Sequence, residues 1–231
     1  YDYEGYLNLN LDVQGFFISI VGVLAVTLII CVCAFACNGG KIKFNAKYYF
    51  VCYRIADDAI SASSLSGTVS SYGGAGYILN YKNSYYVTVS CYYTERDAQA
   101  VCDSLKKRDL DCSVLKTEIT QFKLKGFSAQ RNAQLYLGNL NTLDALSALA
   151  YDCANGLDTG EFTQSKAKEV VSAIKSGLNG LLAANPSNCF TEKLMRLCAE
   201  CDDKQKGFLY SKDMRYLQIA LTDTVINTVL N

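Results

Sequence analysis

The sequence predicts an α+β fold that is followed by a bundle of helices and preceded by one membrane-spanning helix. Three observations lead to this prediction. Residues 48–120 alternate between short runs rich in tyrosine and valine and stretches with helical spacing, residues 127–231 show helical spacing alone, and residues 15–37 carry no charge. A chain of 231 residues, half of them apolar, is expected to fold into one or two compact domains.

The uncharged stretch at residues 15–37 reads GFFISIVGVLAVTLIICVCAFAC. At the rise of an α-helix it spans roughly 35 Å, which is enough to cross the hydrocarbon core of a lipid bilayer. A signal peptide has a shorter apolar core and a small-residue cleavage site, and a buried helix of this length is unusual in so small a protein. We therefore predict a transmembrane helix, with a short polar lead at 1–14 and a linker at 38–47.

Residues 48–120 predict two strand and helix units of similar design. The stretch SYYVTVSCYYTERDA, residues 84–98, reads as a strand that leads to a helix capped by Thr94, with Asp97 completing a capping box. The other elements give the order β-α-β-β-α-β: strands at Tyr48–Tyr53, Tyr77–Tyr81 and Cys112–Ile119, a helix from Asp57 to Ser71, and a hairpin turn at Lys82 and Asn83. YYFVCYRIADDA at 48–59 also echoes VTVSCYYTERDA at 87–98. Both features predict a split βαβ unit, the ferredoxin-like arrangement.

The second half of this region, YYVTVSCYYTERDAQAVCDSLKKRDLDCSVLKTEI, resembles the SPOR domain, the sporulation-related repeat of bacterial envelope proteins. The resemblance covers about residues 44–120. Where the family has a glycine after the strand and another after the second helix, this chain has Ser90 and Asp109. The positions that match the family pattern in order are Val87, Val89, Ser90, Tyr92, Arg96, Ala98 and Leu105.

This resemblance implies binding of peptidoglycan glycan strands on the open face of the sheet. Ten of the seventeen tyrosines lie between Phe44 and Tyr93, and aromatic rings on an open sheet can stack on sugar faces. The alternative is that these tyrosines only reflect strand propensity and half-burial. Strand alternation predicts that Tyr49, Val51 and Tyr53 face outward with Tyr86, Thr88 and Ser90. The predicted glycan-binding residues are Tyr49, Tyr53, Tyr86, Thr88, Ser90, Tyr92 and Arg96.

Four amphipathic helices with short loops are predicted in residues 127–231, which favours a small helical bundle. A spacer, a surface for a partner protein and part of a homo-oligomer are all compatible with such a bundle. Cys198 and Cys201 form a C-x-x-C pair inside a helical stripe, where core packing is favoured over redox or metal chemistry. Asp202–Gly207 has lysines where a calcium loop needs oxygen ligands, so we predict no metal there.

The composition argues against several classes of function. Histidine is absent, which excludes His-based triads and His metal ligands within the chain. No carboxylate pair, serine elbow or catalytic lysine stands in a supporting context, so we predict a non-enzymatic protein without a cofactor. Residues 41–125 carry 12 basic and 8 acidic residues, too weak a charge for nucleic-acid binding, so an RNA-binding sheet is a minor alternative. A thiol enzyme ranks last.

The cysteines and the membrane orientation leave two questions open. Of eleven cysteines, eight lie outside the membrane segment. Their core positions favour free thiols, while an oxidising compartment would allow pairing. Lys41, Lys43, Lys47 and Arg54 follow the membrane segment, which by the positive-inside rule places the large domain in the cytoplasm.

The resemblance implies the opposite orientation. We follow it and predict a single-pass cell-membrane protein with extracytoplasmic soluble domains that binds peptidoglycan, with a link to cell division or sporulation. The alternative function is a membrane-tethered protein-interaction scaffold whose ferredoxin-like domain has lost glycan binding.

Overall fold

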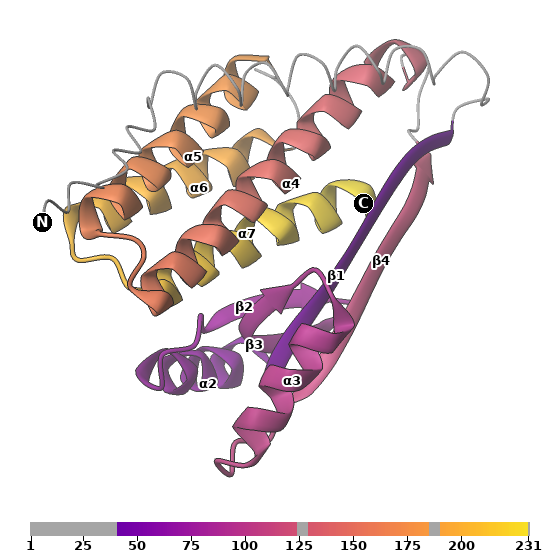
Figure 1. The fold of residues 1–231 in the computed structure, drawn as a ribbon. Helices are drawn as coiled ribbons and strands as arrows, with labels where there is room; N and C mark the ends of the chain where they lie inside the picture. Colours follow the sequence, from indigo (N-terminus) through magenta and orange to yellow (C-terminus); the bar gives the residue numbers. More distant parts are fainter. Residues whose placement is uncertain (1–40, 124–128, 185–189, 231) are drawn as a thin grey trace, which may run out of the picture.

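Four strands form one antiparallel sheet in the spatial order β2-β3-β1-β4 (Figure 1). The computed structural model describes residues 41–123, 129–184 and 190–230. In chain order the strands are β1 (Lys41–Ala56), β2 (Tyr77–Tyr81), β3 (Ser84–Tyr92) and β4 (Ser113–Lys123).

Two helices connect the strands and four more follow them. Because α2 (Ala59–Ser71) lies between β1 and β2, and α3 (Glu95–Lys106) between β3 and β4, the predicted order β-α-β-β-α-β is confirmed. The helical character predicted for residues 127–231 is also confirmed where the structure describes them. These helices are α4 (Ala129–Thr159), α5 (Gln164–Ala184), α6 (Thr191–Lys206) and α7 (Ser211–Leu230).

The predicted polar lead at 1–14 and the predicted membrane helix at 15–37 lie outside the described residues. Among the helices that the structure does describe, none combines the length and the apolar character that a bilayer crossing requires.

Strand β1 is longer than predicted, because it includes most of the segment expected to be a linker. Residues 41–47 pair with β4, from Lys41 opposite Lys123 to Lys47 opposite Glu118. The sequence KIKFNAK alternates polar and apolar residues, and Ile42 and Phe44 are buried. Alternation of this kind is the pattern of a half-buried strand, so the prediction of a linker was wrong from residue 41 onwards.

Both connecting helices begin at side-chain caps, Asp58 and Thr94, of which the cap at Thr94 was predicted from the sequence. The carboxylate of Asp58 accepts hydrogen bonds of 2.9 Å from the amides of Ile60 and Ser61 at the start of α2. At the start of α3, Thr94 Oγ1 accepts from the Asp97 amide at 3.2 Å and donates to the Asp97 carboxylate at 2.6 Å. These bonds satisfy amides that have no partner within the helix.

Two tight connections depend on residues in the left-handed region. Lys82 and Asn83 have φ values of 51° and 62°, which is the requirement of a type I′ hairpin turn, so the predicted β2-β3 hairpin is confirmed. Asp109, after α3, has φ 58°. It occupies the place where the SPOR pattern has glycine, the residue that adopts this conformation most readily.

The two faces of the sheet are covered by different helices. Figure 1 shows α2 and α3 on one side of the sheet and the bundle of α4 to α7 on the other. On the bundle side, Tyr48 and Phe50 of β1 and Leu79 of β2 share one buried cluster with Leu140 of α4 and Leu217 of α7. The sheet and the bundle therefore share one hydrophobic core.

A β-bulge changes the direction of side chains in the middle of the sheet. Val51 pairs with Ser90 whereas Cys52 pairs with Thr88, so Val89 is an extra residue on β3. Because a bulge shifts the alternation by one residue, Thr88 shares a face with Cys52 on the bundle side, and Ser90 shares a face with Val51 on the side of α3. The prediction that Thr88 and Ser90 face the same way was wrong.

Candidate functional site on the sheet

The structure does not bring the seven predicted glycan-binding residues to one open face. Tyr49, Thr88 and Ser90 are only 7%, 0% and 2% exposed. Tyr53, Tyr86 and Tyr92 are half-buried, and Arg96 at the start of α3 is exposed. The expectation of one outward face was therefore wrong, while a role of these residues in glycan binding stays a prediction.

These residues are also divided between the two faces of the sheet. Tyr49 and Tyr92 pack in the cluster under α3, and Tyr53 packs in the cluster under α2. Tyr86 packs against the bundle-side core. The error arose because even-numbered residues of β1, such as Tyr48 and Phe50, face the bundle, whereas the sequence analysis had put the odd-numbered ones on the face of Tyr86.

Two tyrosine–aspartate hydrogen bonds join the sheet to the bundle. The hydroxyl of Tyr48 on β1 donates to Oδ1 of Asp144 on α4 at 2.8 Å, and that of Tyr77 on β2 donates to Oδ2 of Asp223 on α7 at 2.8 Å. Burial raises the pKa of both carboxyl groups, although the bonds from the tyrosines oppose this. Burial and the neighbouring carboxylate also raise the pKa of both tyrosines, so the phenols remain donors.

A second set of polar contacts reaches the C-terminal end of β3 from α4 and α7. Gln218 Nε2 donates to the carbonyl oxygen of Cys91 at 3.0 Å. Ser147 Oγ lies 3.1 Å from the hydroxyl of Tyr93 and 2.8 Å from Oγ1 of Thr222. Gln218, Ser147 and Thr222 are all buried, so these bonds satisfy the Gln218 amide nitrogen and the two hydroxyls, which would otherwise be costly to bury between the two layers.

Aromatic rings complete this interface. The ring of Tyr151 on α4 meets Tyr93 at a centroid distance of 5.5 Å and Tyr92 at 6.1 Å, both edge to face. Tyr77 meets Tyr216 of α7 at 5.2 Å in the same manner. Edge-to-face pairs of this kind add to the stabilisation from buried area. The tyrosine-rich character that suggested sugar stacking is thus used in part to hold the bundle.

The opposite face of the sheet carries a hollow between α2 and α3. Its lining is largely apolar, and Arg108 is the one charged side chain in it. Of the predicted site residues, Tyr53 alone reaches this hollow. The lining residues are Tyr53, Thr68, Val69, Tyr72, Gly74, Val89, Leu105, Arg108, Leu110 and Cys112.

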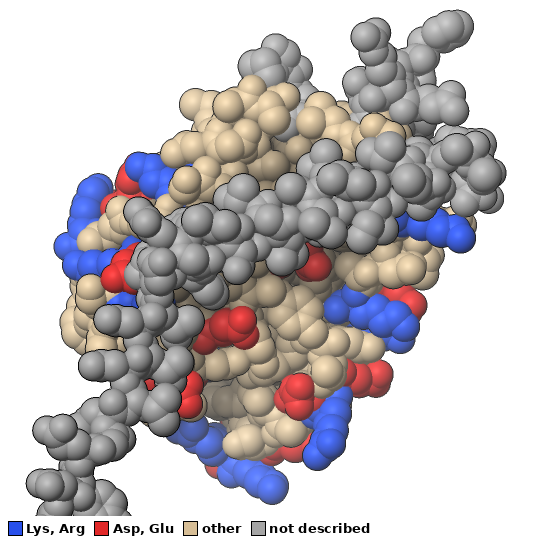
Figure 2. Space-filling view, turned by 45° about the horizontal axis from the view of Figure 1, so that its top comes forward, with Lys and Arg blue, Asp and Glu red and all other residues tan. Residues whose placement is uncertain are grey.

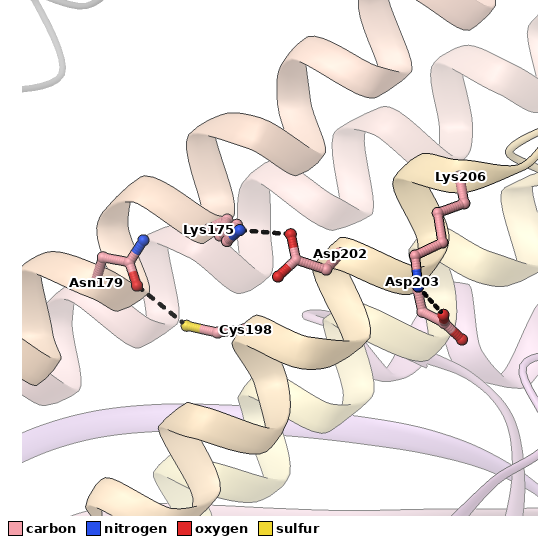
Figure 3. A network of polar contacts seen from close by, with 6 residues as sticks. All are labelled: Lys175, Asn179, Cys198, Asp202, Asp203 and Lys206. Carbon is pink, nitrogen blue, oxygen red and sulfur yellow. Dashed lines mark hydrogen bonds and ion pairs between the residues drawn. The ribbon is translucent and has the colours of Figure 1, made fainter.

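The C-x-x-C pair lies where α6 packs against α5. Cys201 is buried in the core, and Cys198 Sγ is 3.5 Å from Oδ1 of Asn179, beside the ion pair of Lys175 with Asp202 (Figure 3). Burial raises the pKa of Cys201 to about 12, so the thiol is protonated at neutral pH, which disfavours metal binding and nucleophilic chemistry. Within the described ranges, no group of three or more acidic, cysteine or histidine side chains could hold a metal ion.

The segment that superficially resembles a calcium loop is occupied by lysine ion pairs. Lys206 Nζ lies 2.9 Å from Oδ1 of Asp203 (Figure 3), and Lys204 Nζ lies 2.6 Å from Oδ1 of Asp213. The two lysines therefore compensate acidic groups that a cation would need.

One exposed pair of aromatic residues was not identified from the sequence, and we call it the aromatic patch: Phe208 and Tyr210. They are 63% and 56% exposed. Their rings lie 5.0 Å apart in a tilted arrangement, and Leu209 between them in the sequence is buried. The amino group of Lys212 lies over the Tyr210 ring and donates to the carbonyl oxygen of Ser70 at 3.0 Å, two residues before Tyr72. The sequence feature that could have revealed this patch is the run Phe208-Leu209-Tyr210 between α6 and α7.

The charged side chains do not form a patch of one sign on the face drawn in Figure 2, where lysines and arginines alternate with acidic residues. Nucleic-acid binding requires a basic surface. No family model, curated protein or solved structure matches this chain. Its function is therefore inferred from the arrangement of its own residues.

Proposed function

We propose that this chain is a membrane-anchored interaction protein in which the sheet holds the helical bundle and binds no glycan strand. The observation that carries the proposal is the covered sheet: the face opposite α2 and α3 packs against α4 and α7. The anchor is the helix predicted at residues 15–37. The protein is non-enzymatic in this proposal.

The order of elements and strands supports a ferredoxin-like arrangement for residues 41–123. In such an arrangement two helices cover one face of the sheet and the other face is left for a ligand or a partner. Here the chain's own helices occupy that face. A glycan strand could use it only after the bundle had moved away.

The energy of that movement equals or exceeds the whole binding energy of an ordinary ligand. It would expose the bundle-facing side chains of the sheet, at about 1.5–3 kcal/mol each. For the large ones this amounts to roughly 8–15 kcal/mol, whereas a micromolar ligand contributes about 8 kcal/mol in total. The large side chains are Ile42, Phe44, Tyr48, Phe50 and Leu79.

Peptidoglycan binding in a bacterial envelope remains the competing proposal, and it rests on the SPOR resemblance. In this structure, a glycan could reach Arg96, which is exposed, and the half-buried rings of Tyr53 and Tyr92. Arg96 and Tyr53 lie away from the bundle, whereas the ring of Tyr92 also meets Tyr151 of α4. A link to division or sporulation belongs to this competing proposal.

Cosedimentation of residues 41–231 with purified peptidoglycan, before and after amidase treatment, separates the two proposals. We expect no retention above that of an unrelated protein of similar size. Arg96→Ala serves as the glycan-site variant, and Arg196→Ala, on the exposed surface of α6, is the matched control. Retention that rises after amidase treatment and falls only in Arg96→Ala would overturn the scaffold proposal.

The partner surface that we assign is the aromatic patch, because large exposed aromatic side chains are enriched at protein interfaces. The test places a photo-crosslinking amino acid at Tyr210 in the full chain, in the membranes of producing cells. Met195, 60% exposed on α6, is the control position. We expect discrete crosslinked products from position 210 and none from position 195. Equal products from both positions, or none from either, would refute this assignment.

A further inference from the structure

Two cysteines face each other across the connection between α3 and β4. Cys102 on α3 and Cys112, just before β4, have their Sγ atoms 2.9 Å apart. Each thiol also lies against the backbone of the other residue: Cys102 Sγ is 3.2 Å from the carbonyl oxygen of Cys112, and Cys112 Sγ is 3.1 Å from that of Cys102. The two side chains are therefore directed at one another.

This geometry is close to that of a disulfide. A disulfide has sulfur atoms about 2.0 Å apart, so the two Sγ atoms need to approach by less than about 1 Å. The pair is also separated from most of the other buried thiols. Cys102 and Cys112 belong to the cluster under α3, whereas Cys52, Cys91 and Cys201 belong to the cluster on the bundle side.

We propose that Cys102 and Cys112 form an intramolecular disulfide in the mature protein, and that the sheet accordingly lies on the oxidising side of the membrane. Disulfides form and persist in extracytoplasmic compartments and are rare in the cytosol. The bond would thus decide between the two orientations that the positive-inside rule and the SPOR resemblance favour.

The bond forms by thiol–disulfide exchange with a disulfide oxidant. The thiolate of one cysteine attacks a sulfur of the oxidant, which forms a mixed disulfide and releases one thiol. The thiolate of the second cysteine then attacks the sulfur of the first, closes the Cys102–Cys112 bond and releases the other thiol of the oxidant. The two cysteines lose two electrons and two protons, and the oxidant takes them up.

Cys112 is the cysteine that reacts first with the oxidant. Its side chain lines the hollow between α2 and α3, whereas Cys102 lies deeper, at 1% exposure. Burial raises the pKa of Cys112 to about 12, so little of it is thiolate at neutral pH and exchange is slow. The bond is therefore expected to be a structural one that is formed once.

Trypsin cuts between the two cysteines, at Lys106, Lys107 and Arg108, which makes the bond directly measurable. The full chain is incubated with oxidised glutathione and then denatured in the presence of iodoacetamide, which blocks the remaining free thiols. It is digested with trypsin and analysed by mass spectrometry without reduction. We expect peptide 97–106 to be linked to peptide 109–116, each of which contains one cysteine. Reduction should release both peptides. The link should persist in Cys201→Ser and be lost in Cys102→Ser, with Cys112 then carrying glutathione.

The same two peptides show whether Cys102 and Cys112 are linked by a disulfide in cells. Intact producing cells are treated with a membrane-permeant maleimide before lysis, and the full chain is digested without reduction. The linked pair is the expected result. Alkylation of both cysteines in cells would overturn the proposed orientation, even if glutathione forms the bond in vitro. Failure of glutathione to link them, or links to other cysteines, would overturn the pairing itself.

Discussion

The hydroxyl of Tyr48 tests whether the bundle is held on the sheet as described. Tyr48→Phe keeps the ring and removes the donor to Asp144, which is 2.8 Å away. A hydrogen bond to a charged group contributes about 1.5–3 kcal/mol to stability. The half-buried carboxylate of Asp144 would also lose a hydrogen-bond partner. We therefore expect the free energy of unfolding to fall by about 2 kcal/mol.

A double-mutant cycle isolates the contribution of the pair. Asp144→Asn keeps an oxygen acceptor without the charge, and a neutral hydrogen bond contributes about 0.5–1.5 kcal/mol. In that background, Tyr48→Phe should cost about 1 kcal/mol. The difference between the two costs is the coupling between the phenol and the charge.

Urea unfolding of residues 41–231, followed by far-ultraviolet circular dichroism, measures these free energies. Tyr210→Phe is the matched control, because Tyr210 lies in the exposed aromatic patch and its change should stay within about 0.5 kcal/mol. If Tyr48→Phe changed the free energy of unfolding as little as Tyr210→Phe, the bundle would not be packed against the sheet. Glycan binding on that face would then be possible.

Three further predictions concern the bundle, a helix cap and the response to pH. Leu217→Ala, in the fully buried face of α7, should cost about 2–5 kcal/mol in urea unfolding; a cost below about 1 kcal/mol would contradict the packing of α7. Asp58→Ala removes the cap of α2 and should cost about 1 kcal/mol, a value that circular dichroism melts can check. Burial raises the pKa of Asp144 and Asp223 above the unfolded value, so the native state takes up protons that the unfolded state does not. Stability should therefore increase as the pH falls from neutral through the folded pKa values, and the increase should shrink when both residues are asparagine; an unchanged profile would count against this origin.

Local features of the fold were predictable because a few neighbouring residues determine them. Asp58 and Thr94 cap their helices, and the pair Lys82 and Asn83 makes the hairpin turn, through contacts within three residues. The first half of β1 was predictable as well. The alternation from Ile42 to Tyr48 is regular, but the two glycines before it suggested a linker.

The arrangement of the faces was not predictable, because it depends on distant partners. The bulge at Val89 follows from the pairing of β3 with β1, and nothing within β3 distinguishes Val89 from Val87 by residue type. The covering of the sheet depends on contacts such as Tyr77 with Asp223, which are 146 positions apart. A tyrosine in a strand has the same pattern whether it stacks on a sugar or donates to an aspartate of a helix.

The long antiparallel pair of β1 and β4 has a mechanical consequence. The two strands are paired from Lys41 opposite Lys123 to Cys52 opposite Ser113, and the chain enters and leaves the pair at the same end. If the proposed membrane anchor before Lys41 and the bundle after Lys123 were pulled apart, the backbone hydrogen bonds would open one after another from that end. Hydrogen bonds that are pulled from one end of a strand pair break one at a time at low force. When the two strands are pulled from opposite ends, all the hydrogen bonds between them bear the force together. This end of the pair would yield first, so Ile42 and Phe44 would leave the core before Tyr48 and Phe50.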